Sequence, residues 1–178
     1  GEFLKQAIEL THKNGALFIA DEMVTGFKTG FPGSMSKYDL VPDMTTWGKG
    51  IANGFSFCAL TGKKEIMELG GIKREGEEKV FLISTTHGGE THAMAACLAT
   101  MKEFETKDVI GHNHRIGALI ISKMKQILES KNLEKFILVS ETPWMVGFTF
   151  KSQNGNVCNG MRTLVIQENF KNRNIMML

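Results

Sequence analysis

Residues 16–20 (ALFIA), which Asp21 and Glu22 follow directly, constrain the fold of this chain more than any other feature of its sequence. A short, continuous apolar run without polar alternation is typical of a strand that is buried on both faces in a parallel sheet. Open α/β sheets bind their ligands beyond the carboxyl ends of the strands, which is the position of Asp21. Asp21 is therefore the first candidate for a functional residue.

The rest of the sequence alternates between helical and strand patterns. Predicted strands cover residues 16–22, 44–47, 57–62, 136–140, 146–150 and the start of another at 174–178. Predicted helices cover residues 3–13, 63–69, 91–104, 116–128 and 160–170, and the helix at 91–104 is apolar on most sides, which predicts burial. The loop at 70–79 is predicted to be mobile. Alternating strands and helices, followed by a separate strand and helix group, predict an α/β domain over 1–130 and a lesser α+β domain over 131–178.

Composition excludes several classes of protein. The chain has 178 residues, 42% of them hydrophobic and 22% charged, which is typical of a globular protein. A formal net charge of +2 provides no broad electrostatic basis for binding nucleic acid or anionic membrane. No run of about eighteen apolar residues is present, so we expect no membrane span. Three widely spaced cysteines favour a reducing, cytoplasmic setting over a disulfide framework.

Lys49 is the second candidate, because it follows the predicted strand 44–47 and lies between Gly48 and Gly50. A strand-end carboxylate and a lysine freed by glycines are the groups that a pyridoxal phosphate enzyme requires. The lysine amine forms an imine with the cofactor aldehyde, and the carboxylate keeps the ring nitrogen protonated. The residues alone leave other interpretations open, since strand-end aspartates are often caps or ion-pair partners and Gly-Lys-Gly is often a turn.

Histidines and acidic residues do not predict a metal site. His87, Glu90 and His92 lack the spacing of the helical zinc motif, so a loop and helix start is the better interpretation. His12, His112 and His114 fall on polar helix faces and are expected to be solvated.

Four blocks in order resemble the class III aminotransferases, and most of all the branch that contains glutamate-1-semialdehyde aminomutase. The blocks are GALFIADEMVTGFKTG, YDLVPDMTTWGKGIANGF, GKKEIME and THGGETHAMAACLATM. The resemblance implies part of the large domain of a fold-type I pyridoxal phosphate enzyme, a mostly parallel sheet with helices on both faces. Part of a small α+β C-terminal domain would follow. It covers nearly the whole chain and is clearest up to Phe104.

The resemblance also implies roles for individual residues. Lys49 matches the Schiff-base lysine, and Asp21 matches the carboxylate that pairs with the pyridine nitrogen. Met23 stands where the family usually has a valine packed on the ring face. Thr86 matches the threonine that binds the cofactor phosphate of the other subunit, which implies a homodimer. Glu22 belongs to the signature and is expected to support the loop that follows it.

The implied activity is amino transfer on a small amino or carbonyl substrate through a Schiff base on Lys49, of either the aminotransferase or the aminomutase kind. A racemase or decarboxylase on the same scaffold is an alternative. The family's Ser/Gly-rich phosphate loop and stacking aromatic residue belong to a part that has no counterpart in this sequence, so the chain resembles a fragment. A catalytically inert fragment is therefore a further alternative. The loop TTHGGETH also departs from the family's usual pattern, and its role is open.

Overall fold

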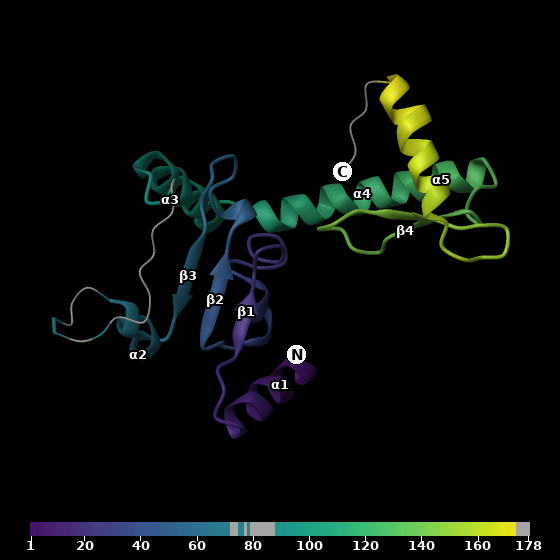
Figure 1. Ribbon diagram of the computed structural model, residues 1–178. Helices are drawn as coiled ribbons and strands as arrows, with labels where there is room; N and C mark the ends of the chain where they lie inside the picture. The colour runs from purple at the N-terminus through teal and green to yellow at the C-terminus, as the bar shows by residue number, and fades with distance from the viewer. Residues whose placement is uncertain (72–74, 77, 79–87, 174–178) are drawn as a thin grey trace. The chain divides into compact units, whose positions relative to one another are not determined.

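The computed structural model describes residues 1–71, 75–76, 78 and 88–173 (Figure 1). The chain divides into two compact units, Gly1–Ile110 and Gly111–Leu178, which are described separately here. The division into domains at residue 130 stays a prediction. Among the described residues, no helix is long and apolar enough to cross a membrane. The described residues also contain no cluster of histidine, cysteine and acidic side chains that could hold a metal ion.

The first unit is built on a sheet of three strands. Strands β1 (Ile19–Asp21) and β2 (Met44–Trp47) are parallel, and β3 (Ala59–Gly62) pairs antiparallel with β2, which lies between the other two (Figure 1). The helices of this unit are α1 (Glu2–Lys13), α2 (Lys64–Met67) and α3 (Thr91–Thr106). Short 3₁₀ turns are η1 (Ser34–Tyr38), η2 (Lys49–Ile51) and η3 (Glu68–Gly70). These elements confirm the predicted α/β class and the predicted positions of its helices and strands.

Strand β1 is shorter and more exposed than its sequence predicts. Only three residues of the apolar run pair as a strand, and Leu17 and Ile19 are 51% and 54% exposed. The reason is that, among the described residues, β1 pairs with β2 on one side and has no strand on the other. Burial of the run on both faces is therefore not observed in this part of the chain.

An aromatic cluster forms the core of the first unit. Phe27, Ile51, Ala52 and Cys97 are buried together, and Trp47 and Phe104 pack against them. The ring of Phe27 meets the edges of Trp47 and Phe104 at centroid separations of 6.0 and 5.3 Å. Helix α3 contributes Cys97 to this core and buries Ala93 as well, whereas Leu98 is exposed. The helix was correctly predicted, but its predicted burial on most sides is wrong for the described residues.

The second unit contains most of helix α4 (Val109–Ser130), a hairpin of β4 (Ile137–Val139) and β5 (Phe148–Phe150), and helix α5 (Asn159–Leu164). A π-helical turn, η4 (Val165–Phe170), and a 3₁₀ turn, η5 (Lys171–Arg173), follow α5. Gly117 of α4 lies against the backbone carbonyl of Pro143, where a larger side chain would collide. These elements confirm the predicted helices and the two predicted strands, which pair as a hairpin. The predicted strand at 174–178 lies outside the described residues.

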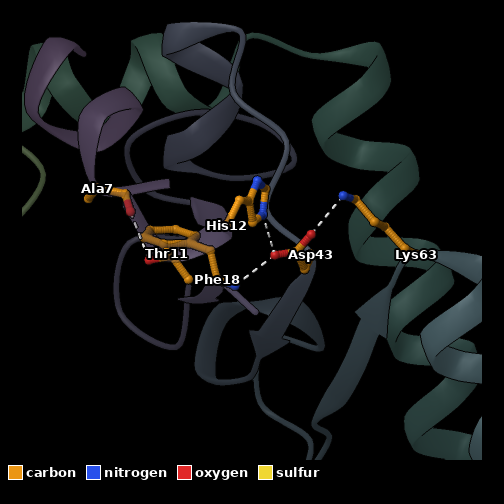
Figure 2. Close-up of polar contacts among 6 residues, drawn as sticks. All are labelled: Ala7, Thr11, His12, Phe18, Asp43 and Lys63. Atoms are coloured by element: carbon orange, nitrogen blue, oxygen red, sulfur yellow. Dashed lines mark hydrogen bonds and ion pairs between the residues drawn. The ribbon is translucent and has the colours of Figure 1, made fainter. Parts of the chain in front are cut away.

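Asp43 lies just before β2 and joins helix α1 to the residues that flank strands β1 and β3 (Figure 2). Its carboxylate, only 3% exposed, lies 2.7 Å from both His12 Nε2 of α1 and Lys63 Nζ, which follows β3. The backbone N–H of Phe18, just before β1, donates to Asp43 Oδ2 at 2.7 Å. His12 was predicted to be solvated, and its side chain is 41% exposed as predicted, while its ring also contacts Asp43 (Figure 2).

These contacts make the stability of the first unit dependent on pH. The hydrogen bond from Lys63, then those from Phe18 N–H and His12, hold the pKa of Asp43 well below its ordinary value, and the same bond raises the pKa of Lys63. Because the folded pKa of Asp43 is depressed, its contribution is fully present above the unfolded value of about 3.9 and is lost as pH falls through the folded value.

We expect the urea midpoint of unfolding to fall as pH is lowered below about 4, and Asp43→Asn to flatten this dependence. Asp39→Asn is the matched control, because Asp39 is exposed and its left-handed backbone (φ 53°) suits asparagine. The same slope in Asp43→Asn as in the unaltered chain would contradict this role of Asp43.

Candidate active site

The carboxyl ends of β1 and β2 meet at one edge of the sheet, because the two strands are parallel. Their register places Asp21 opposite Thr46. Lys49 begins turn η2 just beyond the end of β2. The structure thus brings Asp21 and Lys49 to the same edge, and the positive charge of Lys49 contributes to the electrostatic environment of the Asp21 carboxylate.

The Asp21 carboxylate is held through a single oxygen. Its Oδ1 accepts hydrogen bonds from the backbone N–H of Met23 at 2.9 Å and from Thr46 Oγ1 at 3.0 Å. These two bonds, in this order, and then the charge of Lys49, lower the pKa of Asp21 against the opposing effect of desolvation. Among the described residues, Oδ2 accepts no hydrogen bond. The carboxylate is therefore oriented through Oδ1, and Oδ2 remains without a hydrogen bond in this part of the chain.

Lys49 projects from a turn whose following residues are anchored in the core. Ile51 and Ala52 are 2% and 1% exposed and belong to the aromatic cluster, while Lys49 itself is exposed. Lys49 adopts a left-handed backbone conformation, φ 48°, which is uncommon for a residue with a side chain. Gly50 approaches Phe27 closely enough that an added Cβ would lie 3.5 Å from Phe27 Cβ. The turn is thus fixed beneath the lysine, and its amine is left accessible.

Met23 lies beside the same turn. Its sulfur packs against Gly48, so closely that any side chain at position 48 would require Met23 to move. Glycine at position 48 thus makes room for a half-buried methionine beside the turn that carries Lys49. Packing of Met23 on a cofactor ring stays a prediction.

Glu22 faces the opposite side of the chain from Asp21 and organises the loop after β1. Its carboxyl group, in a residue that is 2% exposed, accepts hydrogen bonds from Thr25 Oγ1, Ser34 Oγ at 2.7 Å and Met35 N–H at 3.1 Å. Gly33 leaves space for it, since a Cβ there would lie 2.7 Å from Glu22 Oε1. The prediction that Glu22 supports the loop is confirmed.

Thr86 lies outside the described residues, as does His87, so neither is placed at the site. Conversely, Thr46 was not predicted as a site residue. The signal that could have identified Thr46 is strand pairing. The residue of β2 that lies opposite Asp21 must present its side chain on the same face of the sheet. That signal needs the strand register, which the sequence does not provide.

Comparison with known proteins decides the family. The family described as "Aminotransferase class-III" matches residues 1–173. The chain belongs to the class III aminotransferases. Its predicted family is confirmed.

Relatives of this class III aminotransferase chain include two glutamate-1-semialdehyde 2,1-aminomutases. That of Nitratidesulfovibrio vulgaris is 35% identical over 147 residues, covering 83% of this chain and 33% of the relative. That of Legionella pneumophila is 35% identical over 153 residues, covering 86% and 34%. The chain therefore spans about a third of the length of the curated relatives it matches.

Solved structures show the same fold. A Bacillus anthracis aminotransferase has a TM-score of 0.78 and 25% identity, with 98% of this chain and 39% of that chain covered. A Pseudomonas aeruginosa glutamate-1-semialdehyde aminomutase in complex with PMP has a TM-score of 0.63 and 24% identity, with 80% and 32% covered. These neighbours confirm the predicted fold-type I architecture.

Proposed function

We propose that this class III aminotransferase chain carries the lysine and aspartate of a pyridoxal phosphate site, at the edge where β1 and β2 end. The observation that carries the proposal is that a lysine and a carboxylate with a lowered pKa lie at the same edge of the sheet. The donor set fits the cofactor. A primary amine can bond to its aldehyde, and a carboxylate with a lowered pKa can hold a protonated ring nitrogen.

When bound, pyridoxal phosphate supplies an aldehyde for covalent attachment and a ring that withdraws electrons from the substrate carbon. In our proposal, Lys49 Nζ would hold the cofactor through its aldehyde. When it is free, the same amine would move a proton at the substrate carbon. Its place on an exposed turn with a fixed base is suited to both tasks.

Asp21 has an electrostatic role in this proposal. Its carboxylate would hold a proton on the ring nitrogen, and a protonated ring is a strong electron acceptor. The bonds from Met23 N–H and Thr46 to Oδ1 support this role, because they orient the carboxylate and favour its charged form. Met23 would pack on the face of the ring.

We infer amino transfer as the reaction, on a small amino or carbonyl substrate. The 35% identity to aminomutases favours transfer of an amino group within one substrate, and transfer between two substrates uses the same residues. A homodimer in which Thr86 binds the phosphate of the other subunit's cofactor, and a cytoplasmic location, stay predictions. Because the chain spans about a third of its relatives, cofactor binding by this chain is itself part of the proposal.

The test is covalent trapping. The chain is incubated with pyridoxal phosphate, its visible absorbance is recorded, and the Schiff base is reduced with borohydride before peptide mass mapping. We expect the pyridoxyl group on Lys49. Label spread over exposed lysines such as Lys64, which is 85% exposed, would instead favour an inert fragment.

A further inference from the structure

Thr46 makes two different contacts with the segment that carries Asp21. Its side-chain Oγ1 donates to Asp21 Oδ1 at 3.0 Å, and its backbone carbonyl accepts the N–H of Glu22 at 3.0 Å. The strand register places Thr46 directly opposite Asp21. One residue of β2 thus determines both where the end of β1 lies and how the Asp21 carboxylate is turned.

The second donor to Oδ1 comes from the turn that directly follows Asp21. Met23 N–H reaches the same oxygen at 2.9 Å, so two donors converge on Oδ1 from different directions. A carboxylate held by two donors on one oxygen has a fixed plane, and its other oxygen has a fixed direction. Met23 N–H alone would leave the carboxylate free to rotate about the Cβ–Cγ bond of Asp21.

We propose that Thr46 is a positioning residue for Asp21: its hydroxyl sets the direction of Asp21 Oδ2 and keeps the carboxyl group in its charged form. The role of Thr46 rests on the proposed function of Asp21 as the partner of the cofactor ring nitrogen. Hydrogen bonding to a carboxylate stabilises its ionised form, which agrees with the Thr46 hydroxyl lowering the pKa of Asp21.

The experiment is a carboxyl carbon NMR titration of the full 178-residue chain without cofactor, labelled with carbon-13 at aspartate. The chain has four aspartates, Asp21, Asp39, Asp43 and Asp108, so a subtraction spectrum from Asp21→Asn assigns the signal of Asp21. Between about pH 4 and pH 6 the signal of Asp21 should stay at its ionised position in the unaltered chain, because its pKa lies below the ordinary value of about 3.9.

In Thr46→Val, the valine side chain has nearly the same shape as threonine but lacks the hydroxyl that donates the hydrogen bond. We expect this substitution to move the Asp21 titration upward relative to the unaltered chain. Thr46→Ser keeps the hydroxyl and should restore the low titration. The control is Thr45→Val, on the same strand but facing the other side of the sheet, which should leave the Asp21 signal unchanged.

An unchanged Asp21 titration in Thr46→Val, with amide signals showing a folded chain, would overturn the proposal. If Thr46→Val does not fold, Thr46→Ala and Thr46→Ser are compared instead, since only the serine variant keeps the donor. Equal Asp21 titrations in these two variants would also overturn the proposal.

Pyridoxal phosphate binding, measured on the same samples by absorbance, tests the proposed function separately. We expect Thr46→Val to weaken it on the order of tenfold. A shifted titration in a chain that binds no cofactor would refute the proposed function and leave the role of Thr46 in place.

Discussion

Replacing Lys49 with alanine is expected to lower the rate of amino transfer by about three orders of magnitude or more. The reason is that the proposed site uses Lys49 Nζ twice, first to hold the cofactor and then to move a proton at the substrate carbon. Nothing else at this sheet edge can replace it among the described residues, since Asp21, Thr46 and Met23 carry no amine. The measurement is the rate of amino transfer at saturating amino donor, together with the yield of borohydride-trapped cofactor.

Lys64→Ala is the matched control for this prediction. Lys64 lies on α2, is 85% exposed and makes only a long ion pair with Glu68, 3.7 Å between Nζ and Oε1. Its loss should leave both the rate and the trapped yield unchanged. Adding a small primary amine to Lys49→Ala should restore part of the rate, because a free amine can carry the proton in place of Nζ. Equal activity in Lys49→Ala and in the unaltered chain would refute the proposed mechanism.

The second large effect is expected on stability. Glu22→Ala should lower the free energy of unfolding by about 3 kcal/mol or more, because it leaves buried donors without an acceptor. Those donors are the hydroxyls of Thr25 and Ser34 and the backbone N–H of Met35. Removal of the Glu22 side chain also leaves a cavity next to Gly33, which has no side chain to fill it. Urea unfolding of the chain measures the change.

Glu9→Ala provides the comparison, since Glu9 is exposed on α1 and its loss should change stability by less than about 0.5 kcal/mol. Glu22→Gln keeps the shape of the side chain but turns one acceptor into a donor. Its loss of unfolding free energy should therefore lie between those of Glu22→Ala and Glu9→Ala. Because Glu22 faces away from Asp21, the folded fraction of the Glu22→Gln variant should keep its affinity for the cofactor. Loss of cofactor affinity without loss of stability would mean that Glu22 acts at the site rather than in the loop.

The local pattern of the chain was sufficient for the elements and the family. The helix at 3–13, the strand at 44–47 and the helix at 91–104 are recognisable because side-chain periodicity follows from backbone geometry within a few residues. The signature around Asp21 and Lys49 is similarly local. A strand end and a turn carry it, and together with the other blocks of the resemblance, in order along the chain, it identifies the class III aminotransferases.

Burial could not be read in the same way. The run at 16–20 and the helix at 91–104 have sequences that indicate full burial, yet Ile19 and Leu98 are exposed in the described part of the chain. Apolar character states what a side chain would gain from burial, whereas its actual exposure depends on which neighbours pack against it. Neighbours come from distant parts of the sequence.

Polar contacts between distant residues were decided by the tertiary structure for the same reason. His12 of α1 and Lys63 meet at Asp43 because the fold brings these distant segments together (Figure 2). Thr46 meets Asp21 because β1 and β2 pair in one register. A shift of that register by one residue would turn every side chain of β2 to the opposite face. Residue types and their order thus name the groups that do the chemistry in this chain. Strand pairing, which joins segments far apart in the sequence, decides which of those groups hold one another in place.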